Sequence, residues 1–448
     1  MFHQPLRPHN LIVYVVVCVL LGGAAACYTA PALKSDRALS LWKDIGSQTE
    51  HATAPTPGTA AFSLDTAITQ ALKSNPDLRR LRARIPLGEA KINLAGQWPN
   101  PEFRLSEVAL DDLVEGEPTM EFALRFRMKA PGTIRAKEHA EELSLQQLLA
   151  RITRLEHQVR VEVRRLFKRV AIVDLDIAEV VLEIQVRQSH VELVKKRLDA
   201  GVSVEVDLAL AVLPHAQSLD EKEALLLKRG VVEDRLRSLL GVVVLPPIGG
   251  ASSLDVNESL PELQPPGALV EKALRNRPEL REAALRVGRS RANASLAKRL
   301  QWPWPEFAQI NYELRHPLEP TRFGFAVGLN IPVFDWSSNR LNIHLADVAL
   351  KRIEEDNLIR QVEREVQSAR ARVVSLGKRL RSLRTHLLPA ATQGAQAVQR
   401  ALDAGTLDPL RATIVEGRRI RAKRAYLKVL AAYYDAAFDL EMALGPSP

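Results

Sequence analysis

The chain has 448 residues, of which 46% are hydrophobic, 26% are charged and only 5% are aromatic, a composition typical of long helices. The net charge of +9 is spread among 53 acidic residues without a dense basic block, which predicts a solvated basic surface and no nucleic-acid partner. The two cysteines are Cys18 and Cys27, and Cys18 lies inside an N-terminal apolar run, so a mature chain would carry no disulfide.

The N-terminus has the pattern of an export signal. Residues 11–26 form an apolar run that follows Arg7 and ends in small residues. We therefore expect a signal peptide over residues 1–26 and a loosely packed leader over residues 27–61. Two outcomes stay open: cleavage on an Ala-x-Ala pattern, or acylation of Cys27 as the first residue of a lipoprotein. No later apolar run reaches the ~18 to 20 residues of a membrane-spanning helix, so any membrane crossing would be made by strands.

The rest of the chain is predicted to be a tandem duplication. Residues 97–103 read QWPNPEF, and residues 301–307 read QWPWPEF. Three further matches keep nearly the same offset: 71–79 with 273–281, 198–201 with 402–405, and 240–241 with 444–445. So long a period indicates two copies of a whole structural unit. The repeats are expected over residues 62–241 and 267–445, with a Pro/Gly-rich connector over residues 242–266.

Each repeat should begin with short helices. Ser63 is the predicted N-cap of the first one, and apolar residues follow it at helical spacing. Pro76 and Pro86 should break or bend the helix. The two prolines of the Trp-Pro-x-Pro motif then end it.

After each Trp-Pro motif the apolar period changes from helical to the alternation of a strand. In residues 121–128 the apolar side chains fall on one face and Arg125 and Arg127 on the other. We expect β-hairpins within 101–128 and 305–331, with strands of about nine or ten residues, the length of a tilted strand that crosses a bilayer. A soluble sheet stays open as the alternative. Polar strand residues predicted to line a lumen are Arg125, Arg127, Asn311 and Arg322. Tryptophans that would suit an interfacial belt, or alternatively fill a core, are Trp98, Trp302, Trp304 and Trp336.

Four strands cannot close a barrel around a lumen. An open sheet edge cannot face lipid, because its backbone groups would lack hydrogen-bond partners. The chain must therefore form oligomers, and three copies would supply twelve strands, a number found in closed barrels.

Long helices are expected after each hairpin. Residues 135–200 contain no proline, and apolar residues step through them by threes and fours. Residues 339–404 contain a heptad series from Val362 to Leu387, which predicts coiled-coil packing. Pro389 should bend this second helix.

The long helices should end at Ala-Gly pairs. Gly201 and Gly405 can take the left-handed conformation that closes a helix. Return helices are then expected over residues 205–240 and 409–444.

In their order, spacing and twofold recurrence, these features resemble the TolC-type outer-membrane efflux proteins. The motifs that carry the resemblance are NPDL at residues 75–78, RPEL at 277–280, IPVFD at 331–335, the Trp-Pro segments and the Ala-Gly tips. The resemblance implies a mainly α fold with a membrane β-barrel part. It would be a homotrimer with four strands per chain in a shared 12-stranded barrel, on a long α-helical coiled-coil tunnel.

The resemblance also implies functional residues at the tips of the tunnel. Asp207 matches an Asp that relatives carry beyond the tip glycine, and Asp408 matches it in the second repeat if a short deletion is allowed. Arg411 stands where an acidic gate residue would be expected. The residues implied to contact an adaptor protein are Gly201, Val202, Ser203, Gly405 and Thr406.

The implied function is a passive exit duct in the outer membrane of a Gram-negative bacterium, with its helices in the periplasm. Its partners would be outer-membrane lipid, a periplasmic adaptor and an inner-membrane pump of RND or ABC type, in efflux of metals or drugs or in type I secretion. The sequence shows no catalytic or metal-binding motif, so no enzyme activity and no cofactor are expected. The alternatives are an exported trimeric coiled-coil scaffold or adhesin without a pore, and a periplasmic enzyme.

Overall fold

The computed structural model describes residues 62–106, 120–245, 263–314, 322–331, 338–404 and 409–446. The expected signal peptide and leader, Cys27, Gly405, Thr406 and Asp408 lie outside these ranges.

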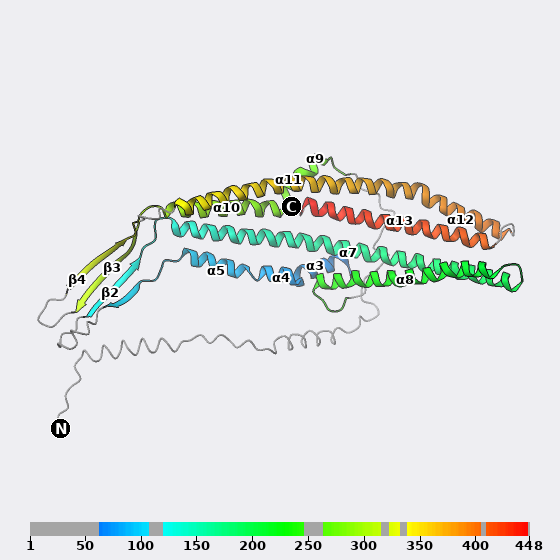
Figure 1. Cartoon of the computed structure of the whole chain (residues 1–448), viewed down its shortest axis with the longest axis horizontal. Coiled ribbons are helices and arrows are strands. Elements are labelled where there is room, and N and C mark those ends of the chain that lie inside the picture. The colour runs from blue at the N-terminus through cyan, green and yellow to red at the C-terminus, as the bar shows by residue number, and fades with distance from the viewer. Residues whose placement is uncertain are drawn as a thin grey trace, which may run out of the picture. The chain divides into compact units, whose positions relative to one another are not determined.

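The described residues form helices that run side by side, with one four-stranded sheet beyond one end of them (Figure 1). The elements of the first half are α3 (Leu64–Ser74), α4 (Pro76–Arg82), α5 (Ile85–Gly96), β1 (Glu102–Ser106), β2 (Met120–Arg127), α7 (Thr133–Asp199) and α8 (Glu205–Leu240). Those of the second half are α9 (Pro266–Asn276), α10 (Pro278–Arg299), β3 (Pro305–Leu314), β4 (Arg322–Leu329), α11 (Ser338–Ser382), the π-helix η2 (Leu383–Leu387), α12 (Leu388–Asp403) and α13 (Pro409–Leu444).

Side-chain caps and prolines divide the N-terminal helices as the sequence predicts. The backbone N–H of Thr66 donates to the Ser63 hydroxyl at 3.2 Å, which confirms Ser63 as the N-cap of α3. Asn75 caps α4 in the same way, because its side-chain oxygen accepts from the N–H groups of Asp77 and Leu78 at 3.1 Å. Pro76 then occupies the first position of α4, where the missing N–H costs no helical hydrogen bond.

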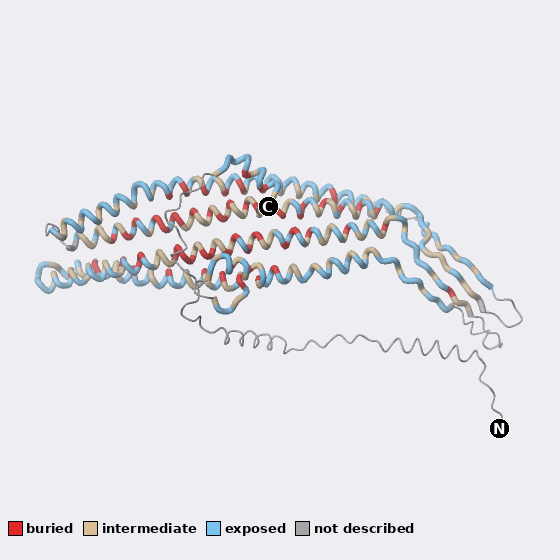
Figure 2. The backbone as a smooth tube through the Cα atoms, turned by 180° about the vertical axis from the view of Figure 1, so that it is seen from behind, coloured by how far each residue is buried: buried red, intermediate tan, exposed pale blue. Residues whose placement is uncertain are grey.

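Helix α7 is the element on which the bundle is built. It runs for 67 residues and begins at Thr133, two residues before the predicted start, after Gly132 with φ of 75°. At 1.5 Å per residue such a helix is roughly 100 Å long. It packs against α8, α10 and α13. Figure 2 shows its buried residues running along the middle of the bundle.

Two apolar cores lie along α7. One joins α7 to α3, α4 and α8 through fully buried residues such as Leu78 of α4, Leu166 of α7 and Leu236 of α8. The other joins α11, α13 and α9 and reaches α7 at Ala171 and Ile172. The long helix therefore shares its buried faces between both halves of the chain.

The long helix expected over residues 339–404 is interrupted next to Pro389, where the sequence predicts a bend. The chain forms α11, then the five-residue π-helix η2, then α12. Pro389 lies just after η2 and cannot donate a backbone hydrogen bond, and the N–H of Leu388 reaches back five residues to the carbonyl of Leu383. The heptad series ends here as well: Val362 to Leu380 supply the buried positions, but Leu387 is 38% exposed.

The sheet is antiparallel, with strand order β1-β2-β3-β4. Hairpin pairing within each half was expected, and the pairing of β2 with β3 additionally joins the two halves. One irregularity, between Pro305 and Phe307, shifts the register of β3 against β4. Strands β1 and β4 are the edges of the sheet.

Candidate functional site: a two-faced sheet and a helical tip

The strand register separates apolar from polar side chains across the whole sheet. Phe122 pairs with Tyr312, Leu124 with Ile310, and Ile310 with Phe325, so these side chains share one face. The alternation predicted from the sequence is thereby confirmed for both hairpins. Residues on the apolar face come from all four strands: Phe103, Leu105, Phe122, Leu124, Phe126, Ala308, Ile310, Tyr312, Phe323, Phe325 and Val327.

The apolar face carries a row of aromatic rings at one height. Phe103, Phe122, Tyr312 and Phe323 follow one another across the four strands, with ring centroids 6.1, 6.5 and 5.0 Å apart. These distances are within the range of favourable aromatic pairs. Nothing in the described chain covers this face, and Phe325 beside the row is 81% exposed. The row joins residues far apart in the sequence, so only the register identifies it.

The opposite face is polar and internally hydrogen-bonded. Arg125 donates to the Gln309 side chain at 2.6 Å, and its guanidinium lies 3.9 Å from the centroid of the Phe307 ring. Arg127 forms an ion pair of 2.5 Å with Glu102 on the edge strand. The four residues predicted to line a lumen, Arg125, Arg127, Asn311 and Arg322, all lie on this face.

The tryptophans next to the strands are exposed. Trp98, Trp302 and Trp304 are 66%, 77% and 40% exposed, so the alternative that they fill a core is wrong for these three. Trp336 lies outside the described residues.

The turn between α7 and α8 is closed by a left-handed glycine, as predicted. Gly201 has φ of 71°, its N–H donates to the carbonyl of Leu198, and the N–H of Val202 donates to the carbonyl of Arg197, both at 2.9 Å. These two bonds are those of a Schellman motif. They satisfy carbonyls at the end of α7 that would otherwise lack a partner.

Asp207 caps the start of α8. Its carboxylate accepts from the Ser203 hydroxyl at 2.8 Å and from the N–H of Val204 at 3.3 Å. Those two hydrogen bonds, the Ser203 bond first, hold the pKa of Asp207 below its ordinary value. The gate role of Asp207 stays a prediction, and in the single chain its contacts are those of a helix cap.

The Asp207 cap predicts a pH dependence at the tip. Because the folded-state pKa is lowered, the stabilisation is present above the ordinary value of 3.8 and is lost as the pH falls through the folded value. We expect the protection of the Val204 amide, which is its intrinsic exchange rate divided by the observed rate, to fall on acidification, as measured by hydrogen exchange. Asp207→Ala removes the acceptor and should show low protection at every pH. A parent chain whose protection at this amide did not change with pH would contradict the cap.

The tip also exposes apolar side chains that the prediction of site residues missed. Val202, Val206, Leu210 and Leu213 are 59% to 69% exposed. The last three are spaced by four and three residues, a heptad rhythm that was visible in the sequence of α8. Of the second tip, Gly405, Thr406 and Asp408 lie outside the described residues, and Arg411 is exposed on α13.

A cluster of charged residues ties α13 to α7 and α8 away from the tip. Arg424 of α13 contacts Asp176 at 2.8 Å and Glu183 at 3.2 Å on α7, and Glu221 at 2.5 Å on α8. The hydrogen bond to Glu221 is the main cause that raises the pKa of Arg424, and the same bond lowers the pKa of Glu221. Neighbouring Lys423 pairs with Glu179 at 2.5 Å.

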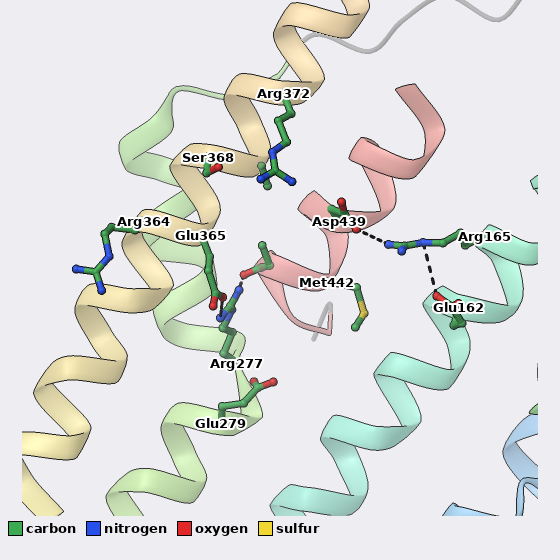
Figure 3. A pocket seen from close by; sticks show the side chains of 12 residues that line it. Glu162, Arg165, Arg277, Glu279, Arg364, Glu365, Ser368, Arg372, Asp439 and Met442 are labelled. Carbon is green, nitrogen blue, oxygen red and sulfur yellow. Dashed lines mark hydrogen bonds and ion pairs between the residues drawn. The ribbon is translucent and has the colours of Figure 1, made fainter. Parts of the chain in front are cut away.

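Near the C-terminal end of α13, a cavity of about 560 Å³ opens between α7, α10, α11 and α13. Figure 3 shows Arg165 directed toward Asp439, and Arg277 directed toward Glu365. The first pair is 2.6 Å apart and the second 2.7 Å. Within the described part of the chain, no group of three or more His, Cys, Asp or Glu residues is arranged to hold a metal ion. Within the same residues, no helix combines the length and the apolar character needed to span a membrane.

Comparison with known proteins gives one family and one fold. Residues 269–446 match the family model described as outer membrane efflux protein. Among solved structures, the chain is similar to CusC, whose crystal structures concern folding and transmembrane channel formation. The TM-score is 0.69 and the identity 17%, and the match covers 87% of this chain and 93% of that one. It is also similar to the outer membrane protein VceC from Vibrio cholerae, with a TM-score of 0.65, 16% identity, and coverage of 86% of this chain and 96% of that one. The open state of the Neisseria gonorrhoeae MtrE outer membrane channel is similar with a TM-score of 0.64 and 15% identity. This match covers 85% of this chain and 88% of that one.

A search of curated protein sequences gave no significant match. The structural likeness shows that the chain has the fold of these channels. Together with the family match, it confirms the resemblance to outer-membrane efflux proteins.

Proposed function

We propose that this chain, whose residues 269–446 match the family of outer membrane efflux proteins, is one subunit of a passive outer-membrane duct. Its helices would stand in the periplasm of a Gram-negative bacterium, and the energy for transport would come from an inner-membrane pump. The observation that carries the proposal is the sheet, which has an uncovered apolar face, a polar opposite face and two edge strands.

The edges of the sheet support a homotrimer. In a hydrocarbon layer, the backbone groups of β1 and β4 need partners, and only closure of the sheet supplies them. Three copies of the four-stranded sheet would make twelve strands. The edge β4 of one copy would then pair with β1 of the next. Closure with the polar face inward places Arg125 and Gln309 in the lumen and the aromatic row against lipid.

The row of aromatic rings suits the height of a membrane interface. Aromatic side chains gather where hydrocarbon meets the headgroups in proteins that span membranes. The exposed Trp98 and Trp302 adjoin the strands at their helical ends and would form the periplasmic side of such a belt. If Cys27 is acylated, its lipid would add an anchor to the same leaflet.

The test of this function is reconstitution of the purified full-length chain. A duct should migrate as a heat-modifiable trimer in detergent and should conduct ions in a planar lipid bilayer. The alternative, a trimeric coiled-coil scaffold or adhesin, would leave the bilayer without conductance. A chain that stays monomeric and water-soluble without detergent would contradict both.

We further propose that the helical tips receive a periplasmic adaptor of an RND or ABC pump. The exposed apolar residues Val202, Val206 and Leu210 would bury against it. The cargo class expected for such a duct is metal ions or drugs, with protein secretion as the other possibility.

If the tips bind the adaptor, a change at the tip should reduce export without affecting trimer assembly. Gly201→Val forces a β-branched residue into a left-handed conformation, at a cost of roughly 1–3 kcal/mol, and no other atom lies within 4 Å of the added Cβ. The strain is confined to the tip, so trimers should form normally while export falls. The measurement is export or resistance in cells beside trimer yield. Gly230→Val, in the middle of α8 with equally open space, is the control. Normal export with Gly201→Val would count against the tips as docking points.

A further inference from the structure

One face of α13 carries only basic, apolar and small residues near the second tip. The residues concerned are exposed and are separated alternately by three and four positions, so they form one straight stripe along the helix. We call it the α13 stripe; its members are Arg411, Ile414, Arg418, Arg421, Ala425 and Lys428. It spans roughly 25 Å at 1.5 Å per residue and contains no acidic residue.

Basic residues beside the stripe are neutralised, whereas those on it are not. Arg424 contacts three carboxylates, Arg419 pairs with Glu416 at 2.5 Å, and Lys423 pairs with Glu179. Within the described residues, Arg418 has no acidic partner, and Arg421 contacts only a carbonyl of its own helix, that of Gly417. The stripe therefore presents uncompensated positive charge to solvent.

The same face leads into the cavity of Figure 3. Continuing the spacing from Lys428 reaches Asp435 and Asp439, which pair with Arg169 and Arg165 of α7. On the other wall of the cavity, Arg364 and Arg372 lie two turns apart on α11 with Ser368 between them. Neither arginine has an ion-pair partner among the described residues. The cavity is lined by four arginines and four carboxylates, so its net formal charge is zero, and the excess of positive charge lies on the stripe.

The position of α13 limits what this face can contact. Helix α13 packs against α7 on one side and against α11 and α12 on the other, as Figure 1 shows. Copies that join at the edges of this layer would meet through α8 and α12, where α8 exposes apolar residues such as Leu227 and Val231. The α13 stripe lies between the edges, so it is left facing water, either inside a closed tube or outside it.

We propose that the α13 stripe lines the conduit and makes it prefer anions as cargo. The inference rests on the proposed duct function. A ring of the same cations from each copy, in the narrow helical part of a tube, raises the local concentration of anions and lowers that of cations. Cargo bearing carboxylate, phosphate or other oxyanion groups would be favoured over organic or metal cations.

The experiment is a permeability measurement on the purified full-length trimer in a planar bilayer, with a gradient of potassium chloride. The wild-type chain should pass chloride in preference to potassium, as expected for a positively charged lining. The variant Arg418→Glu with Arg421→Glu reverses charge on the stripe and should bring the ratio of chloride to potassium permeability to about one or below. The control Lys378→Glu with Arg381→Glu makes the same change on α11, away from the positions that line the cavity, and should leave the ratio unchanged.

Each outcome decides a separate point. A conducting channel that is unselective or prefers potassium overturns the anion preference but leaves the duct. Chloride preference that survives the stripe variant, or that falls equally in the control, overturns the assignment to α13. Absence of any conductance overturns the duct itself. If the reversed variant does not assemble, the neutral Arg418→Gln with Arg421→Gln gives the same test with about half the change in charge.

Discussion

Phe325→Arg is expected to prevent the chain from assembling in the membrane. The side chain is 81% exposed at the centre of the apolar face, next to Ile310 on the neighbouring strand. An arginine facing lipid near the bilayer midplane costs about 2–4 kcal/mol. Because ~1.4 kcal/mol corresponds to a factor of ten, the membrane-inserted trimer should fall at least about tenfold. Fractionation of the outer membrane, followed by electrophoresis with and without heating, measures the inserted trimer.

The matched control is Ala326→Arg. Ala326 is the next residue of β4, pairs with Gln309, and lies on the polar face beside Arg125. An arginine there should be solvated in the lumen and should leave insertion intact. If Ala326→Arg blocks insertion and Phe325→Arg does not, the face that carries Ala326 is the one in contact with lipid. If neither has an effect, the sheet does not lie in a membrane.

Arg424→Met is expected to loosen the contact between the two halves of the helical bundle. Methionine keeps most of the length of the side chain but leaves Asp176, Glu183 and Glu221 without their shared cation. The side chain of Glu183 is only 4% exposed, and breaking a buried ion pair costs about 3–5 kcal/mol. Arg187 still contacts Glu183 at 2.5 Å, and Glu221 is half exposed, so we expect a loss nearer to 2 kcal/mol.

Hydrogen exchange of the α7 amides around Glu183 measures this effect as a rise in local opening of about 30-fold. The pKa of Glu221 is lowered in the folded chain, so the contribution of the cluster is present above the ordinary value of 4.5 and fades as the pH falls through the folded value. The difference between Arg424→Met and the parent chain should shrink accordingly in acid. Arg421→Met, on the exposed stripe of the same helix, should exchange like the parent. Equal protection in both variants would show that the cluster stabilises nothing.

Local patterns predicted the elements of this fold well, because each pattern reports on a single element. Ser63 as an N-cap, the breaks at Pro76 and Pro86, and the left-handed Gly201 depend only on neighbouring residues. The alternation in β2 to β4 depends only on which face of a strand is apolar, and the register confirmed it.

Features that depend on contacts between distant residues were not predicted. The aromatic row requires the register of four strands at once, and the Arg424 cluster requires three helices to meet. Asp207 was predicted as a gate residue from the resemblance, whereas its local hydrogen bonds identify a helix cap. The capping-box pattern would not have suggested this role, because residue 204 is a valine, whose side chain cannot accept a hydrogen bond.

The π-helix before Pro389 changes the direction in which the side chains of α12 point. A π-turn holds one residue more than the corresponding α-turn, and one residue corresponds to about 100° of rotation around a helix axis. Every side chain of α12 is therefore turned by that amount relative to an uninterrupted continuation of α11. The long helix of the first half has no such offset, because α7 stays α-helical throughout its length. The side chains of α12 thus point in other directions around their helix axis than those at the corresponding positions of α7, although the two sequences are copies of one another.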